Sequence, residues 1–289
     1  MPLTSTQGEV AAALRAADPA APEALAIFDR IAGAAHPTPD FIEWSAQLTG
    51  ACDAARLTYY FDAARQGEAG LRAVGGRFAA LGDALGAAVP PALLEAFSAL
   101  VPGRREVQQL VLGLDDRPGG ARRVKLYVVL QEAAEGLVDG LIAAAGARRP
   151  EALDAAKVYI LGLDCGAAGI SDAKLYFRLD RARLGRVVSN LREVSDLVKG
   201  TREVVLQRCL LSDRSQIYLH ATDAHTIAGY LARRAWGDAA TAQLNARHRA
   251  AAAHLAHGRL EPWIISFGLR DHQLQWDASN VYYHHTGVG

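Results

Sequence analysis

The chain has 289 residues, with 31 Lys and Arg against 31 Asp and Glu, and 51% of its residues are hydrophobic. A neutral chain lacks the overall positive charge of proteins that bind nucleic acid or anionic membrane surfaces, so we expect neither partner. The length and the apolar content suit one large domain, and we predict a single domain over residues 1–289.

The cysteine pattern and the hydropathy of the chain indicate a cytoplasmic protein. Cys52, Cys165 and Cys209 are scattered without paired spacing, which is typical of reduced proteins. The first ten residues do not form a basic segment followed by an apolar one. No apolar run approaches the roughly 20 residues that span a bilayer. We therefore expect a cytoplasmic monomer with no membrane partner.

Segments with helical periodicity alternate with pairs of segments that have strand character. The predicted helices are 8–17, 22–34, 71–85, 91–100, 133–145, 184–198, 224–234 and 239–257. The predicted strand pairs are 42–49 with 55–62, 106–115 with 122–130, 157–164 with 172–179, 202–211 with 215–221, and 262–269 with 279–285. Short turns between the members of a pair argue against a parallel sheet, because parallel neighbours need long crossovers.

The order helix, strand, strand, helix recurs along the chain, and the sequence repeats with it. Leu112-Gly113-Leu114-Asp115 recurs as Leu161-Gly162-Leu163-Asp164, about 50 residues later, and repeated units of this kind cannot bury their faces alone. Antiparallel strands with helices on one side close most simply into a barrel, which also removes exposed edges. We predict an α+β fold: an antiparallel β-barrel of about ten strands in αββα repeats, surrounded by a ring of helices and wide enough to hold a ligand.

A Lys-x-Tyr motif occurs three times in segments with strand character: Lys125-Leu126-Tyr127, Lys157-Val158-Tyr159 and Lys174-Leu175-Tyr176. Gln216-Ile217-Tyr218 and Asn280-Val281-Tyr282 are weaker versions. Residues i and i+2 of a strand share one face, so each copy places a cation or an amide beside a phenol. A single copy is typical of an exposed edge. Several copies on paired strands instead predict a polar lumen that holds an anion next to aromatic walls.

The αββα repeat and its strands resemble the ABBA prenyltransferases, whose barrel is built from such units with the active site in the lumen. Three stretches resemble the cyanobactin-type peptide prenyltransferases in particular. They are Leu161 to Asp164 leading through a glycine turn into Asp172 to Tyr176, residues 262–265, and residues 280–283.

The resemblance implies electrophilic alkylation by dimethylallyl or geranyl diphosphate. Cations on the barrel wall would hold the departing diphosphate. The residues that we assign to this task are Arg56, Lys125 and Lys174, with Lys157, Arg178 and the amide of Gln216 as further candidates. The tyrosines would flank the allylic carbocation with their π-faces and keep water away from it. These are Tyr60, Tyr127, Tyr176, Tyr218 and Tyr282.

The catalytic base is less clearly marked than the diphosphate site. Members of the family often carry an acidic residue on or just after the first barrel strand, and here Thr49 occupies that position. The nearest acids are Glu43 and Asp53, which we take as the candidate catalytic residues. On residue type alone, an exposed position is expected for Glu43.

No metal-ligand motif is present in the sequence. Asp115-Asp116 continues into Arg117-Pro118-Gly119, so the DDxxD magnesium motif of isoprenyl synthases is absent. A magnesium ion could accompany the diphosphate without dedicated protein ligands.

Three functions remain open. The favoured one is prenylation of a side chain of a ribosomally made, macrocyclic peptide. The others are prenylation of a small aromatic metabolite and non-catalytic binding of an isoprenoid or anionic ligand.

Overall fold

The structure is a computed structural model that describes residues 26–27, 30–31, 39–47, 55–116, 122–233 and 260–285. The predicted helices 8–17 and 239–257, and most of 22–34, lie outside these ranges. Within the described ranges, no helix is long and apolar enough to cross a membrane.

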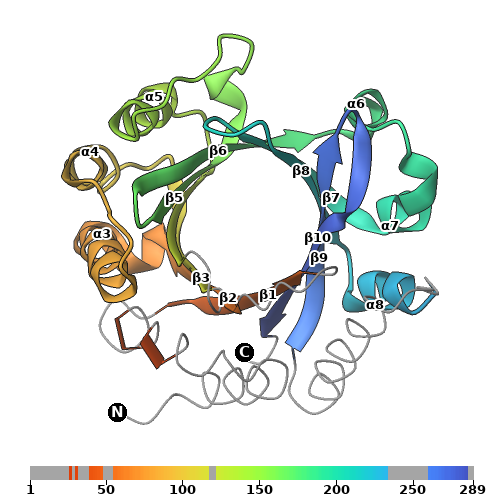
Figure 1. Ribbon diagram of the computed structural model, residues 1–289, viewed down its shortest axis with the longest axis horizontal. Helices are drawn as coiled ribbons and strands as arrows, with labels where there is room; N and C mark the ends of the chain where they lie inside the picture. Colours follow the sequence, from red (N-terminus) through yellow and green to blue (C-terminus); the bar gives the residue numbers. More distant parts are fainter. Residues whose placement is uncertain are drawn as a thin grey trace.

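The described strands form a closed barrel in which every neighbouring pair is antiparallel, in the order β1-β10-β9-β8-β7-β6-β5-β4-β3-β2 (Figure 1). The strands are β1 (Phe41–Gln47), β2 (Ala55–Asp62), β3 (Val107–Asp116), β4 (Arg123–Leu130), β5 (Val158–Gly166), β6 (Gly169–Leu179), β7 (Thr201–Cys209), β8 (Ser215–Ala221), β9 (Leu260–Arg270) and β10 (Gln273–His285). Together with the helices outside them, they confirm the predicted fold class.

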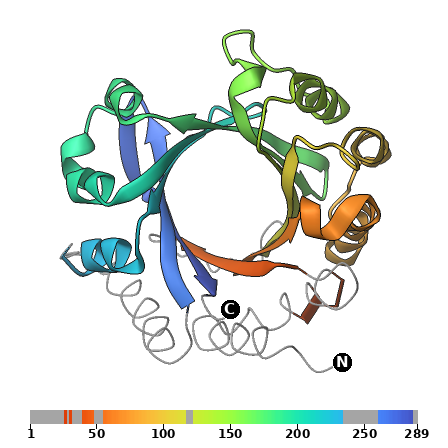
Figure 2. The same cartoon turned by 180° about the vertical axis from the view of Figure 1, so that it is seen from behind.

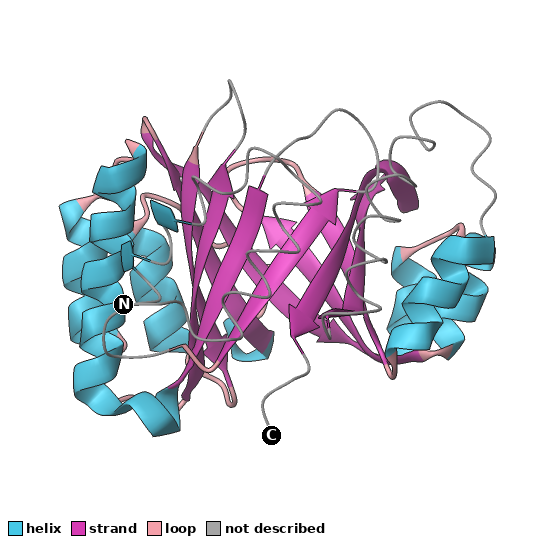
Figure 3. Ribbon diagram, turned by 90° about the horizontal axis from the view of Figure 1, so that it is seen from below, coloured by secondary structure: helices cyan, strands magenta, loops and turns pink. Residues whose placement is uncertain are grey.

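The described helices all lie outside the barrel, which Figure 2 shows from behind and Figure 3 from below. They are α3 (Ala63–Leu85), α4 (Pro91–Leu100), α5 (Glu135–Ala144), α6 (Arg181–Val187), α7 (Ser195–Lys199), α8 (Ala224–Arg233) and the short 3-10 helices η2 (Ala155–Lys157) and η3 (Leu191–Val194). Helices α3, α4 and α5 cover one side of the barrel, and α6, α7 and α8 lie on the other.

The predicted helix 184–198 is wrong as a single element, because the chain divides it into α6, η3 and α7. Val188 is extended, at φ −124° and ψ 122°, where α6 ends. Asn190 then uses its side-chain oxygen to accept the backbone N–H of Leu274 at 2.9 Å. This contact with β10 is tertiary, and local periodicity carries no signal of it.

The barrel turns its apolar face outward, toward the helices. On β2, Leu57, Tyr59 and Phe61 point outward and are fully buried, and helix α3 packs on this part of the sheet with Phe78 and Leu81. Each such side chain contributes about 1.5–3 kcal/mol by leaving water. Since successive residues alternate between faces, the polar residues between them point into the lumen.

The glycines of the repeated Leu-Gly-Leu-Asp sequence face the lumen and make room there. A Cβ atom at Gly162 would lie 2.7 Å from the ring of Tyr127, and one at Gly113 would lie 3.1 Å from Cβ of Lys125. These two positions lie opposite long side chains on neighbouring strands, namely Gly162 opposite Tyr127 and Gly113 opposite Lys125. The repeated glycine therefore has a packing role that depends on strand register.

We predict that Gly162→Ala destabilises the protein by about 1–3 kcal/mol, the usual cost of overpacking a filled site. Gly76→Ala is the matched control, because a Cβ at Gly76 meets nothing within 4 Å. Alanine in a helix interior is favoured over glycine by about 1 kcal/mol, so the control should be neutral or stabilising. Urea unfolding of both variants checks this, and equal stability of the two would contradict the packing role of Gly162.

Candidate active site

The lumen contains a cavity of about 360 Å³, to which every strand of the barrel contributes lining residues. This volume suits a small organic ligand. The cavity has two ends. At the hairpin end, β5 is joined to β6, β7 to β8, and β9 to β10, and at the helix end the strands connect to the outer helices. Each strand therefore presents a series of inward residues from one end to the other.

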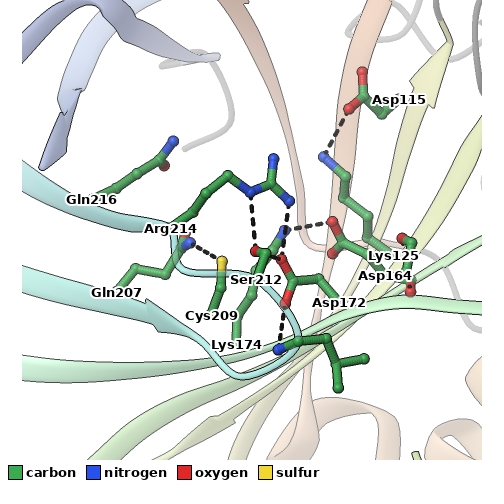
Figure 4. Close-up of polar contacts among 12 residues, drawn as sticks. Asp115, Lys125, Asp164, Asp172, Lys174, Gln207, Cys209, Ser212, Arg214 and Gln216 are labelled. Carbon is green, nitrogen blue, oxygen red and sulfur yellow. Dashed lines mark hydrogen bonds and ion pairs between the residues drawn. The ribbon is translucent and has the colours of Figure 1, made fainter. Parts of the chain in front are cut away.

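Charged residues of alternating sign line the wall at the hairpin end, one from each of five consecutive strands. This charge belt consists of Arg56 (β2), Asp115 (β3), Lys125 (β4), Asp164 (β5) and Lys174 (β6). Arg56 Nε and Lys125 Nζ each lie 3.4 Å from a carboxylate oxygen of Asp115. Lys174 Nζ donates to Asp164 Oδ2, and Figure 4 shows these contacts of the two lysines. The belt thus pairs each cation with a carboxylate on the next strand.

Burial and ion pairing set the ionisation of the belt. Burial lowers the pKa of Lys125, against the opposing effect of Asp115 and Asp164. Burial also works to raise the pKa of Asp164, but the lysines on both sides hold it below its usual value. Lys125 pairs with Asp115 and lies directly opposite Asp164 in the strand pairing, so both carboxylates favour its charged form. A buried ammonium without such partners would be costly.

A second layer, the tyrosine belt, lies next to the charge belt. It contains one residue from each even-numbered strand: Tyr60, Tyr127, Tyr176, Tyr218 and Tyr282. Four of the rings form a continuous row, with centroid distances of 6.2, 5.7 and 5.8 Å from Tyr127 through Tyr176 and Tyr218 to Tyr282. Burial raises the pKa of Tyr127, Tyr176 and Tyr218 well above the usual value. Their hydroxyls are therefore neutral at physiological pH and can donate hydrogen bonds.

Glu43 lies beside the tyrosine belt in an aromatic pocket, opposite Thr58 of β2 in the strand pairing. Its carboxylate accepts hydrogen bonds from Thr58 Oγ1 at 2.9 Å and from the indole nitrogen of Trp263 at 3.0 Å. Phe41 stacks on Tyr60 at 4.0 Å beside it. Burial raises the pKa of Glu43 to about 7, although its hydrogen bonds act in the opposite direction. A carboxyl with this pKa can exchange a proton near neutral pH.

The structure places most of the predicted site residues in the cavity wall. These are Glu43, Arg56, Lys125, Lys174, Gln216 and the five tyrosines of the tyrosine belt. Their functional roles stay predictions. The exposed position expected for Glu43 is wrong, because its exposed fraction is 4%. Asp53 lies outside the described residues.

Two of the predicted diphosphate ligands do not reach the charge belt. Lys157 ends the 3-10 helix η2 before β5 begins, and it pairs with Asp154 at 2.9 Å while both side chains are exposed. Arg178 shares a strand face with Lys174, as predicted, but four residues along a strand correspond to about 13 Å. It pairs with Glu203 at 2.5 Å and lies over the ring of Tyr159. Lys157 and Arg178 therefore lie apart from the charge belt, and this geometry gives no support to their assignment to the diphosphate, which stays a prediction.

Sequence reasoning missed the carboxylates that neutralise the lysines. Asp115 and Asp164 were visible as the last residues of the Leu-Gly-Leu-Asp repeat. They are almost fully buried, at 1% exposure each. Asp115 and Asp164 have the same spacing as Lys125 and Lys174, and this shared spacing could have indicated that the acids belong to the same site. Only the strand register shows which acid lies next to which lysine. Asp164 also keeps one buried oxygen, Oδ1, without a hydrogen-bond partner among the described residues.

The lumen fits a cation-lined anion site better than a metal site. The described residues contain no cluster of three or more His, Cys, Asp or Glu side chains that could hold a metal ion. Mg²⁺ takes oxygen ligands, and the carboxylates of Asp115 and Asp164 in the cavity wall are paired with lysines. Magnesium bound together with a diphosphate stays a prediction.

Comparison with known proteins shows similarity in structure alone. No family model matches the sequence, and no curated protein matches it significantly. Two tryptophan-modifying enzymes each superpose with a TM-score of 0.65. The 5-dimethylallyl tryptophan synthase from Streptomyces coelicolor, solved with DMASPP and Trp, is 14% identical, over 97% of this chain and 93% of that one. The 6-dimethylallyltryptophan synthase from Micromonospora olivasterospora, also with DMASPP and Trp, is 16% identical, over 96% and 95%.

AnaPT from Neosartorya fischeri superposes with a TM-score of 0.54 at 16% identity, over 99% of this chain and 95% of that one. These proteins are ABBA-type prenyltransferases, whereas the likeness to the cyanobactin-type enzymes is not confirmed. At such low identity the similarity concerns the fold. The chain therefore has the ABBA barrel fold of the prenyltransferases, with the cavity in the barrel lumen.

Proposed function

We propose that the protein transfers a dimethylallyl or geranyl group from its diphosphate to a small aromatic acceptor. The observation that carries this proposal is the order of layers in the lumen. Cations line the hairpin end, tyrosine rings follow, and the buried carboxylate of Glu43 lies among aromatic side chains beside these rings. A prenyl donor with its diphosphate at these cations would place its electrophilic carbon between the tyrosine rings, beside this carboxylate.

In the first step, the allylic C–O bond breaks and its electron pair leaves with the diphosphate. The diphosphate gains negative charge as it departs, so ammonium and guanidinium groups in a dry site stabilise the transition state. Lys125, Lys174 and Arg56 supply these groups, and they already face carboxylates that a diphosphate would compete with. The allyl cation remains between the rings of the tyrosine belt, which attract it by about 0.5–2 kcal/mol each.

In the second step, a π-electron pair of the acceptor forms a bond to the allyl carbon, and the resulting cation loses a proton. Glu43 is the group that we assign to this proton, because it is buried, faces the cavity and has a pKa of about 7. Its hydrogen bond from the Trp263 indole demonstrates that an aromatic N–H fits against this carboxylate. An indole or phenol acceptor could donate to it in a similar way.

The structural neighbours favour a small acceptor over a peptide. The two synthases described above are named for tryptophan, and their structures contain it. A peptide acceptor, which the sequence favoured, has no support from them. A small aromatic acceptor, the alternative drawn from the sequence, is therefore our choice.

The proposal is tested by incubating the protein with each of the two prenyl diphosphates and with tryptophan, tyrosine, simple indoles and a macrocyclic peptide, with and without Mg²⁺. Mass spectrometry should detect the addition of C₅H₈ or C₁₀H₁₆ to an aromatic compound. Exclusive labelling of the peptide would overturn the acceptor class. Binding of the diphosphates without any adduct would favour the non-catalytic barrel.

Tyr127→Leu should increase the share of donor that is hydrolysed to the free prenyl alcohol. Loss of one ring from the tyrosine belt removes cation–π stabilisation and admits water, and about a threefold to tenfold change in the ratio of alcohol to transfer product is expected. Tyr127→Phe keeps the ring and should keep the ratio. Chromatography of both products measures it, and an unchanged ratio in the leucine variant would exclude Tyr127 from the shield.

The pH dependence of kcat/KM should follow the ionisation of Glu43. The carboxylate is the active base, so the rate should rise with pH and level off above about 7. Glu43→Gln should lower kcat by about 10²–10⁴ and remove this inflection, as expected for loss of a general base. A rate profile that keeps the inflection in the variant would assign the proton to another group.

The same substitution should change how stability depends on pH. The folded-state pKa of Glu43 lies above the ordinary 4.5, so the stability it contributes is lost as pH rises through about 7. Glu43→Gln removes this loss. Relative to the wild type, the variant should therefore gain thermal stability between pH 5 and pH 8, which melting curves at both values measure.

A further inference from the structure

The hairpin between β7 and β8 places an arginine where the cavity opens at the hairpin end. Arg214 belongs to the cavity lining, although 59% of its side chain is exposed. Its Nη2 donates to Asp172 Oδ2 at 3.0 Å and its Nε donates to Ser212 Oγ at 3.1 Å, as Figure 4 shows. Nη1 has no hydrogen bond to any described residue. Because a guanidinium has five N–H donors, Arg214 can bind a further anion without losing these contacts.

Asp172 fixes the conformation of this hairpin. It is fully buried on β6, and its carboxylate also accepts hydrogen bonds from Ser212 Oγ at 2.9 Å and from the backbone of Leu211 at 3.4 Å. The backbone N–H of Leu210 donates to the carbonyl of Ala173 at 2.7 Å. The hairpin is therefore tied to β6 at several points. An arginine held in this way loses little conformational entropy when it binds a ligand.

Arg214 lies beyond the charge belt along the axis of the lumen. Its partner Asp172 precedes Lys174 by two residues on β6, and two residues along a strand correspond to about 7 Å toward the hairpin end. A prenyl chain between the tyrosines would direct its first phosphate toward Lys125 and Lys174. The second phosphate would then lie further toward the hairpin end, next to the exposed guanidinium, whose planar fork suits phosphate oxygens.

We propose that Arg214, positioned by Asp172 and Ser212, binds the terminal phosphate of the prenyl diphosphate and makes the site selective for diphosphates over monophosphates. This inference rests on the proposed function, because it takes a prenyl diphosphate as the ligand of the lumen. Arg214 is thus a substrate-binding residue, and Asp172 is its positioning residue.

The test measures dissociation constants by calorimetry for dimethylallyl thiolodiphosphate and for dimethylallyl monophosphate. The variants are Arg214→Ala, Arg214→Lys and, as a matched control, Arg208→Ala. Arg208 lies on β7 at the base of the same hairpin and donates to Ser215 Oγ at 2.9 Å, but it is not part of the cavity lining. Its replacement removes the same charge from the same hairpin without changing the cavity wall.

Arg214→Ala should weaken binding of the thiolodiphosphate about tenfold and change binding of the monophosphate by less than about twofold, since one charge-assisted contact to the terminal phosphate is lost. Arg214→Lys should recover part of the loss, because the charge is kept and the fork is not. Arg208→Ala should leave both constants unchanged.

An equal loss for both ligands, or no loss for either, would overturn the assignment of Arg214 to the terminal phosphate. A lower melting temperature with unchanged dissociation constants would do so as well, since it would show that Arg214 only stabilises the hairpin. If the wild-type protein binds the diphosphate, each of these three results would leave the proposed function standing. Wild-type protein that binds neither ligand would overturn the prenyl donor itself, and this inference with it.

Discussion

The alternation of charge around the barrel wall is the interaction on which the site depends. Cations that are to hold a diphosphate must lie in a dry lumen, yet a buried unpaired ammonium is destabilising by several kcal/mol. The charge belt meets both requirements, because Asp115 and Asp164 stand between the cations of neighbouring strands. In the free protein, the two carboxylates neutralise these cations. In the proposed complex, phosphate oxygens would do so as well.

The barrel can carry a polar lumen because its hydrophobic core lies outside the strands, between the sheet and the helices. Leucine, valine and phenylalanine side chains on the outer face pack against the helices, for example Phe61 of β2 and Phe78 of α3. Stability comes from this outer layer. The inner face is then free to carry polar residues, which a sheet packed on both faces could not accept. The separation of a stabilising outer face from a polar inner face follows from the strand period of two.

Position along the strand determines what each inward residue can do. On β6, Asp172, Lys174, Tyr176 and Arg178 follow one another on the same face. They belong in turn to the hairpin anchor, the charge belt, the tyrosine belt and the ion pair at the helix end. One strand thus crosses every layer of the lumen, and the antiparallel register repeats this order on its neighbours. The chemistry that we propose uses this order for the prenyl donor, with the diphosphate at the charge belt and the allyl cation at the tyrosine belt.

The sequence by itself determined the periodic features of the protein. Alternating strands, short turns and helical segments were sufficient to predict the described strands and the barrel. The Lys-x-Tyr pattern and its weaker versions identified four tyrosines of the tyrosine belt, and the pattern also identified Lys125 and Lys174 of the charge belt. These features depend on spacing within one segment, which the sequence displays directly. The first of the structural neighbours is only 14% identical to this chain. The fold could still be predicted, because the spacing of apolar and polar residues can persist when the residues themselves change.

Only the tertiary structure decided which residues meet. Lys157 carries the same motif as Lys174, but it precedes the first residue of β5 and stays in solvent. Asp115, Asp164 and Arg214 join the site through strand register and through a hairpin that folds back on β6. The burial that raises the pKa of Glu43 likewise comes from side chains distant in sequence, such as Trp263. Contacts between strands far apart in the chain leave no local pattern, because their energy depends on closure of the whole barrel.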